Sequence, residues 1–457
     1  MIGLKRKERN NMDTTEKLLE LYKRERGIIE ENCSYILNGT RPSAISSFKK
    51  LGLPTRKLEK YKYTDVAQFF EGDYKVNFNR APSSLKVDEV FKCDVPHLDT
   101  AQAFLVNDSF HPEITKKDIL PRGVTIGGLN AMSERFLEWF AKYYGKIADT
   151  REDAIVALNT ALVQDGVFIY IPKNTVVDMP IQLINILTSK ENLMVNRRLL
   201  IIAEENSQVN FLLCNHTVDP VSFLMTGVTE IFAGENAHVN FYEIEENNSK
   251  SKRFNHTFVY QESNSTVQVN GMTLHNGISC NCTNFYLAGE GAHADCNGMA
   301  ITDKEQHVDN ITLIEHSVPH CTSHELYKYV LDDKSVGAFT GMILVRPNAQ
   351  KTDSIQTNRS ICLTKDARMY ARPQLEIYAD DVKCAHGATV GQLDEDALFY
   401  MRTRGMSMYE ARLLLMFAFI NEVVDKIKIE PLKERLHVLV EKRFKGELCN
   451  CSGSDIK

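Results

Sequence analysis

Two side chains near the C-terminal end of the chain have the types and the spacing of iron ligands. Cys384 and His386 are two residues apart in the segment Lys383-Cys384-Ala385-His386. Alternation along an extended strand places both side chains on the same face. A thiolate and a neutral imidazole both bind iron, and imidazole in place of thiolate changes the charge and potential of a cluster. Spacing alone leaves a buried structural cysteine as an equally good explanation of Cys384.

A second group of cysteines and histidines lies between residues 270 and 325. Its members are His275, Cys280, Cys282, His293, Cys296, His307, His316, His320, Cys321 and His324. No pair has the Cys-x-x-Cys spacing of a zinc knuckle, so packing is the default explanation. Residues one coil apart in a stacked fold can still be neighbours, which leaves a metal site assembled across repeats as an alternative. Cys449 and Cys451, near the C-terminus, are further candidates for metal binding or oxidation.

Several enzyme classes lack their signatures in this sequence. There is no G-x-x-x-x-G-K-[ST] phosphate loop and no G-x-S-x-G nucleophile elbow. The acidic pair Asp380-Asp381 would suit a polysaccharide-cleaving enzyme, but such proteins are usually exported, and no export signal is present. We therefore predict that the chain binds no nucleotide and is not an enzyme.

Bulk composition narrows the class further. The net charge of −6 argues against nucleic-acid binding, and eleven scattered cysteines do not form a disulfide framework. The longest apolar run, 413–420, is too short to span a bilayer. We expect a soluble, cytoplasmic protein that contacts no membrane.

A repeat in the middle of the chain predicts the element that positions these residues. Glu205–Phe211, Glu235–Phe241 and Ser263–Val269 share one outline, and their starts are 30 and then 28 residues apart. Each unit is a polar turn, a small residue and an alternating strand. A period of this length, without intervening helices, predicts a β-helix with small residues such as Ala237 at its corners. An antiparallel sandwich with chance resemblances between its turns is the alternative.

Helical patterns flank the strand-rich region, so we divide the chain into 1–150, 151–392 and 393–457. The first region is helical and mixed: Thr15–Glu31 and Ser133–Tyr144 are predicted helices, and Gly39-Thr40-Arg41-Pro42 is predicted to break the chain. The second region is the β-helix core.

The third region is a helical tail that we expect to bind a partner. Asp394 is a predicted N-cap, Ser407 and Glu410 form a predicted capping box, and Pro431 starts the last helix. The run 413–420 is apolar on every face, which is typical of a helix buried all round. Such a tail would pack on the β-helix and on a partner, although purely intramolecular packing is an equal alternative.

Several segments of the chain resemble the SufB/SufD family of iron–sulfur cluster assembly scaffolds. They are 323–328 (SHELYK), 339–341 (FTG), 349–353 (AQKTD), 373–377 (PQLEI), 384–389 (CAHGAT) and, near the N-terminus, 52–57 (GLPTRK) and 59–64 (EKYKYT). Many members have Trp where this chain has Tyr61. The resemblance implies a mainly β fold, in which a right-handed parallel β-helix (β-solenoid) is flanked by N-terminal helical or mixed and C-terminal helical regions.

Two positions place the resemblance on the SufD-like side of the family. SufB-like members read His-Glu-Ala-Thr where this chain has His386-Gly387-Ala388-Thr389, and they carry a functional cysteine where this chain has Asn358. The resemblance implies a heterodimer with a SufB-like paralogue and a transient, nascent cluster at their interface. His386 is the favoured ligand there, and Cys384 is a second candidate.

The resemblance also implies that a SufC-like ABC ATPase drives conformational change. The expected contacts are in the C-terminal helices: Met408, Tyr409, Arg412, Met416 and Phe419. A homodimer through the same strand edge is plausible when the paralogue is absent. The alternative function is a purely structural β-helix that only holds partners together.

Overall fold

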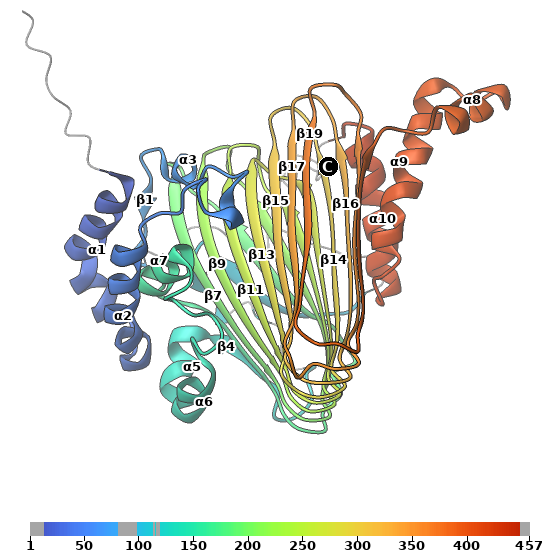
Figure 1. Ribbon diagram of the computed structural model, residues 1–457. Coiled ribbons are helices and arrows are strands. Elements are labelled where there is room, and N and C mark those ends of the chain that lie inside the picture. The colour runs from blue at the N-terminus through green and yellow to red at the C-terminus, as the bar shows by residue number, and fades with distance from the viewer. Residues whose placement is uncertain (1–12, 81–97, 113–114, 116–118, 448–457) are drawn as a thin grey trace, which may run out of the picture.

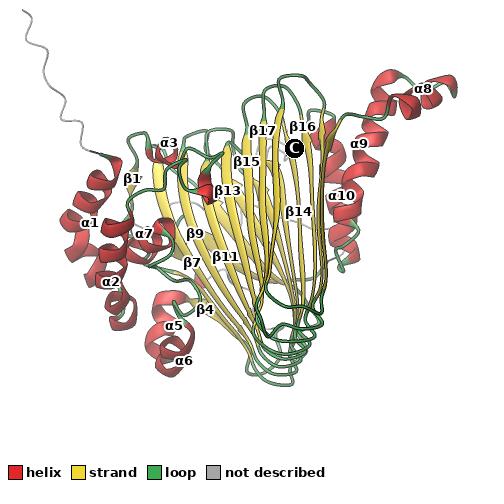
Figure 2. Ribbon diagram, viewed as in Figure 1, coloured by secondary structure: helices red, strands yellow, loops and turns green. Residues whose placement is uncertain are grey.

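The computed structural model describes residues 13–80, 98–112, 115 and 119–447, so Cys449 and Cys451 lie outside the described residues. Two long sheets face each other and are flanked by helices (Figure 1; Figure 2). The strands are β1 (Lys75–Val76), β2 (Ala101–Val106), β3 (Ser109–Phe110), β4 (Thr125–Gly128), β5 (Gly166–Ile171), β6 (Ile181–Leu187), β7 (Leu193–Ala203), β8 (Gln208–Thr217), β9 (Phe223–Ala233), β10 (His238–Glu246), β11 (Lys252–Gln261), β12 (Thr266–His275), β13 (Ile278–Leu287), β14 (His293–Thr302), β15 (His307–His316), β16 (Thr322–Leu331), β17 (Val336–Val345), β18 (Asp353–Cys362), β19 (Arg368–Ile377) and β20 (Lys383–Gly391).

Consecutive strands alternate between the two sheets, which makes the core a parallel β-solenoid. One sheet, called here the odd-numbered sheet, has the order β19-β17-β15-β13-β11-β9-β7-β5-β4 and ends on β4. The other, the even-numbered sheet, has the order β20-β18-β16-β14-β12-β10-β8-β6-β2-β3 and ends on β3. From β5 onward each strand pairs in parallel with the strand two places along, as His238 opposite Thr266 in β10 and β12 illustrates. The predicted β-helix is confirmed, and the sandwich alternative is wrong.

The sequence repeat corresponds to the corner where one strand turns into the next. Asn206, Asn236 and Asn264 all have positive φ, near 55°. This left-handed conformation is costly for most side chains, but asparagine tolerates it. The asparagines also stack along the corner: Asn236 Nδ2 donates to Asn206 Oδ1 at 3.0 Å, and Asn206 Nδ2 donates to Asn174 Oδ1 at 2.9 Å. Ala237 follows directly and is fully buried, as predicted for a corner.

Helices cover the outer faces of both sheets. The helices are α1 (Thr14–Glu31), α2 (Tyr35–Leu51), α3 (Val66–Phe70), α5 (Leu129–Arg135), α6 (Leu137–Tyr143), α7 (Ala154–Leu162), α8 (Glu395–Thr403), α9 (Met408–Val424) and α10 (Glu430–Phe444). The N-terminal helices pack on the odd-numbered sheet, where Phe48 and Leu158 meet Phe254 in one apolar cluster. Helices α9 and α10 pack on the even-numbered sheet, where Ile420 and Leu436 share a cluster with strand residues such as Met299. No helix in the described part of the chain is both long and apolar enough to cross a membrane.

Two of the helix predictions for the first region need correction. The predicted break at residues 39–42 is wrong, because α2 runs through Pro42. The helix survives because Arg41 is buried and donates to the Ala161 carbonyl at 2.8 Å, while Ala44 and Phe48 pack in the core. The predicted helix 133–144 is two short helices that meet at Phe136, whose φ is −120°.

The caps in the third region are confirmed. The Asp394 side chain accepts from two backbone N–H groups of α8, and Ser407 and Glu410 form the capping box of α9. However, α9 is not buried all round within this chain. Its Met416 face lies against the solenoid, whereas the Leu414 side chain is 46% exposed. Part of the apolar surface of α9 is therefore not covered by the rest of the described chain.

The two ends of the solenoid differ. At the first end, β4 pairs antiparallel with β5, and β3 pairs antiparallel with β2, so both sheets close on short strands. At the other end, β19 and β20 are the last strands of their sheets. Nearly every residue of β20 is exposed, including Val390 at 50%. This second end presents open strand edges, which in other proteins recruit further strands.

Candidate functional site

The register of the last strands places His386 over the interior of the solenoid. His386 is opposite Gln356 on β18, Gln356 is opposite Glu325 on β16, and Glu325 is opposite Cys296 on β14. Gln356, Glu325 and Cys296 are buried and face inward. Because in-register parallel strands keep equivalent side chains on one face, His386 points the same way. It is exposed because no coil follows it within the described residues.

A polar column therefore runs through the interior to the open end. Gln356 Nε2 donates to Glu325 Oε2 at 2.7 Å. Burial raises the pKa of Glu325 to about 7, although the hydrogen bonds from Thr312 and Gln356 act in the opposite direction. Glu325 thus titrates near neutrality. Cys296 lies one strand further in and remains a neutral thiol, because burial raises its pKa well above the usual value.

Cys384 shares the inward face with His386 but has a different environment. It pairs with Ser354 and packs on a small apolar cluster that contains Ile343, Val345 and Ala349. Burial, with a further contribution from Asp353, raises the pKa of the Cys384 thiol. A protonated thiol is a poor metal ligand. The structure brings both predicted ligands to one face and favours the accessible imidazole; their role as ligands stays a prediction.

The two positions that distinguished SufD-like from SufB-like chains lie beside this column. Asn358 is fully buried and faces inward, opposite Ala388 of β20. Gly387 faces outward, and a Cβ added there would meet no atom within 4 Å. The fold therefore accepts a larger residue at 387, so glycine there is not a packing requirement.

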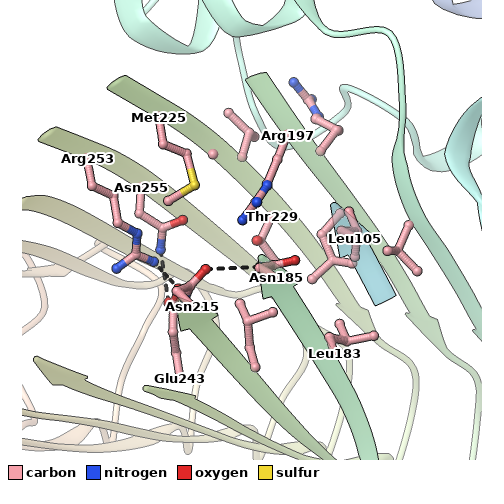
Figure 3. A pocket seen from close by; sticks show the side chains of 16 residues that line it. Leu105, Leu183, Asn185, Arg197, Asn215, Met225, Thr229, Glu243, Arg253 and Asn255 are labelled. Atoms are coloured by element: carbon pink, nitrogen blue, oxygen red, sulfur yellow. Dashed lines mark hydrogen bonds and ion pairs between the residues drawn. The ribbon is translucent and has the colours of Figure 1, made fainter. Parts of the chain in front are cut away.

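A small cavity lies further along the interior, among buried polar side chains. It measures about 30 Å³, and its lining includes Asn185, Asn215, Glu243 and Arg253 (Figure 3). Some of the surrounding groups bond to one another: Asn185 donates to Asn215 at 3.0 Å, Asn215 donates to Glu243 at 3.0 Å, and Glu243 pairs with Arg253.

A buried ionic cluster under α7 is a feature that sequence reasoning missed. Asp153, the N-cap of α7, accepts hydrogen bonds from Lys60 Nζ at 2.6 Å and Tyr61 OH at 2.8 Å. His256 Nε2 of β11 lies 3.3 Å from Asp153 Oδ2, and His256 is directly opposite Cys282 of β13. Residues from three distant parts of the chain therefore meet on the outer face of the odd-numbered sheet.

The charges of this cluster balance. Burial alone would lower the pKa of His256, but Cys282 and Asp153 raise it to about 9. Burial alone would raise the pKa of Cys282, but the hydrogen bond with Cys280 and the charge of Lys60 hold it well below the usual range. The charged forms of His256 and Cys282 therefore stabilise each other, with Lys60 and Asp153 beside them.

The segment 59–64 makes further contacts with the solenoid. Thr64 Oγ1 donates to Asp309 at 2.5 Å, the Tyr63 ring stacks on Tyr370 with centroids 4.3 Å apart, and Glu59 pairs with Arg372. The segment binds strands from β11 to β19 and so ties the N-terminal region to the solenoid. The motif was visible in the sequence, but its contacts were not.

The predicted Cys/His-rich stretch does not gather into one site. Cys280 and Cys282 lie under the N-terminal helices, Cys296 faces the interior, and Cys321 lies near a corner. His293 and His324 do meet, together with Asp295, on the outer face of the even-numbered sheet.

The predicted partner contacts on α9 face in two directions. Met408 and Tyr409 are exposed, Arg412 and Phe419 are half-buried, and Met416 is buried against the solenoid. A groove of about 640 Å³ separates α9 from the end of α10, and Tyr409, Leu413, Leu414, Phe417 and Phe444 line it. Partner binding by these residues stays a prediction.

Comparison with known proteins decides the family. The family described as "SUF system FeS cluster assembly, SufBD core domain" matches residues 185–419, and "SufBD protein N-terminal region" matches residues 12–183. The chain belongs to the SufBD family. SufBD proteins act in iron–sulfur cluster assembly. In this chain the family fold is a parallel β-solenoid with helices on both flanks.

Its relatives include proteins named SufD. An iron–sulfur cluster assembly SufBD family protein of Synechocystis is 29% identical over 429 residues, which cover 92% of this chain and 94% of that relative. The iron–sulfur cluster assembly protein SufD of Escherichia coli is 34% identical over 211 residues, 46% of this chain and 50% of the relative. SufD of Bacillus subtilis is 28% identical over 335 residues, 72% of this chain and 76% of the relative.

Proposed function

We propose that this chain is the SufD-like subunit of a cluster-assembly complex and that it builds a nascent cluster at its contact with a SufB-like paralogue. The observation that carries the proposal is the place of His386: on the last strand, facing the interior column, and exposed at an open sheet edge. A ligand in that place is incomplete by itself, and a second subunit that pairs with β19 and β20 would complete it. The relatives named SufD support the assignment.

The chemistry of the site fits a transient cluster. One imidazole ligand binds less strongly than a thiolate and favours later release of the cluster to an acceptor. Glu325, which titrates near neutrality, lies two strands from His386 in the same column and is placed to exchange protons as sulfide binds. Cys384 is the weaker candidate because its thiol is protonated.

A SufC-like ATPase is the proposed source of motion. It would dock on the groove between α9 and α10, whose apolar lining the rest of the described chain leaves uncovered. Lys328 of β16 binds the other face of α9, where Nζ donates to the Phe419 carbonyl at 2.8 Å. Movement of α9 would therefore reach β16, the strand that carries Glu325. This chain binds no nucleotide in the proposal.

Replacement of His386 tests the proposal. We expect His386→Ala, co-expressed with the paralogue and the ATPase, to give an intact complex that builds clusters at least about tenfold more slowly, because loss of even an indirect ligand contact has an effect of that size. Anaerobic reconstitution followed by visible absorption measures the rate.

Thr389→Ala is the matched control. Thr389 lies on the same exposed strand, but it pairs with Arg359 on the outward face. It should leave the rate unchanged. A His386→Ala complex that assembled clusters at the wild-type rate would leave only the structural, partner-holding function.

A further inference from the structure

Three potential metal ligands converge on the outer face of the even-numbered sheet, away from His386. His293 and Asp295 are on β14 and His324 is on β16, where it pairs directly with Asp295. One ligand atom from each residue lies within 4.8 Å of the other two. His293 Nε2 is 3.2 Å from Asp295 Oδ2, and His324 Nδ1 is 3.6 Å from Asp295 Oδ1. The two imidazole rings meet edge to face, with centroids 5.3 Å apart.

These separations are close to those of a bound metal. Bonds of about 2.1 Å to nitrogen and oxygen ligands place neighbouring ligand atoms about 3 to 3.5 Å apart. The two distances from Asp295 already lie near that range. The remaining adjustment falls on His324, whose side chain is 55% exposed and is therefore free to rotate.

A second contact fixes the orientation of His293. Its Nδ1 lies 2.6 Å from Thr322 Oγ1, on the neighbouring strand. Metal-binding histidines nearly always use their other ring nitrogen in such a hydrogen bond, which sets the tautomer and aims the ligand nitrogen. Nε2 then faces the Asp295 carboxylate at hydrogen-bond distance. A metal ion that binds between the two groups would take the place of the proton that joins them.

The carboxylate offers an oxygen ligand between the two imidazoles, within 3.2 Å of His293 Nε2 and 3.6 Å of His324 Nδ1. The cluster is reached from solvent through His324, so a metal ion has an entry path.

We propose that His293, Asp295 and His324 bind one divalent first-row transition metal ion. Two imidazoles and one carboxylate on one side of the ion, with the remaining positions open, are typical of ferrous sites in proteins, and the same groups also bind zinc. The choice of ferrous iron as the natural occupant rests on the proposed function; the metal site itself does not. The simplest competing explanation is a surface ion pair between Asp295 and protonated histidines.

Metal titration of the full-length chain tests the site. Chelator-treated protein is titrated anaerobically with Co²⁺, whose visible absorption reports nitrogen and oxygen coordination, and then with Fe²⁺ by equilibrium dialysis. We expect one equivalent to bind. His293→Ala and His324→Ala should each weaken binding by about tenfold or more. Asp295→Asn keeps the shape of the side chain and should weaken binding as well, so a folding defect cannot mimic the result.

His238→Ala is the matched control. His238 is exposed on the same face and in the same row of the sheet, because it pairs with Thr266, which in turn pairs with His293. It should bind metal like the wild-type chain. Absence of a bound equivalent, or equal binding by the His293→Ala and wild-type chains, would overturn the proposal.

The supply of iron has a separate readout. If the bound metal feeds cluster assembly, His324→Ala complexes should assemble clusters more slowly at low Fe²⁺ and recover at high Fe²⁺. Cluster assembly that is unchanged at low Fe²⁺ would reject iron supply while leaving the role of His386 intact.

Discussion

At the scale of single residues, environment separates side chains that look alike in the sequence. Cys282 and Cys384 both lie two residues from another potential ligand on a strand. Cys282 is fully buried beside Lys60 and His256, and its pKa is held well below the usual range. Cys384 packs on apolar side chains, and its pKa is raised. The buried thiolate is excluded from solvent, so its effect is on stability rather than on chemistry.

The buried cluster gives a prediction for stability against pH. The pKa of His256 is about 9 in the folded chain and 6.5 in the unfolded chain. A raised pKa stabilises the fold fully below the unfolded value and loses that contribution as pH rises through the folded value. Between pH 6.5 and 9 the His256 contribution to the unfolding free energy should therefore fall by up to about 3 kcal/mol, while the ionised Cys282 contributes with the opposite sign. The wild-type profile should then be nearly flat in this window, and Cys282→Ser, which leaves His256 beside Asp153, should lose stability as the pH rises.

Urea unfolding at a series of pH values measures this difference. His316→Gln is the control, because burial lowers the pKa of His316 to about 4 and leaves it neutral across the window. Its pH profile should follow that of the wild-type chain. Parallel profiles for Cys282→Ser and the wild-type chain would show that the folded chain holds no ion pair between His256 and Cys282.

At the scale of elements, α9 has two apolar faces in different environments. The Met416 and Ile420 face packs on the solenoid, and the Tyr409 and Leu414 face lines the groove beside α10. A helix with apolar residues all round is usually buried all round. Here the second apolar face is open, which is the pattern of a surface that a partner covers.

Two substitutions on the open face should separate binding from folding. We expect Tyr409→Ala with Leu414→Ala to weaken binding of the ATPase subunit by about tenfold or more, because buried aromatic anchors dominate interfaces. The unfolding free energy should change by less than about 1 kcal/mol, because both side chains are exposed. Isothermal titration with the purified ATPase measures the affinity.

Val438→Ala is the control for that experiment. Val438 is exposed on α10 but does not line the groove. It should bind the ATPase like the wild-type chain. Unchanged affinity in the Tyr409 and Leu414 double substitution would place the ATPase elsewhere on the subunit.

At the scale of the whole molecule, the two ends of the solenoid differ in how open their strand edges are. The first end closes on antiparallel strands, whereas β19 and β20 leave their edges open. When the paralogue is absent, we expect two copies to pair through β20, because an unpaired edge is a template for another strand. Val390→Lys should shift that dimer toward monomer, because charged side chains at an edge oppose pairing.

Sedimentation of the isolated chain measures this shift at micromolar concentration. Val438→Lys adds the same charge at an exposed position of α10, outside strands β19 and β20, and should leave the dimer in place. A wild-type chain that is monomeric throughout would refute self-pairing through this edge.

The sequence by itself determined the local features of the fold. The repeated polar turns predicted the coil period. They repeat because each corner contains a left-handed residue, which restricts the residue type, and these residues are Asn206, Asn236 and Asn264. Ser407 and Glu410 predicted the start of α9 because capping involves residues within one turn. The break predicted at Pro42 failed, because tertiary contacts of Arg41 and Phe48 outweigh the local cost of proline.

Only the tertiary structure decided which distant side chains meet. Spacing placed Cys384 and His386 on one face, but strand register decided that this face looks inward and continues through Gln356 to Glu325. Asp153 reaches His256 across 103 residues, and Asp295 meets His324 because β14 and β16 lie side by side. Such contacts depend on the stacking of whole coils, whereas sequence patterns report only the conformations of neighbouring residues.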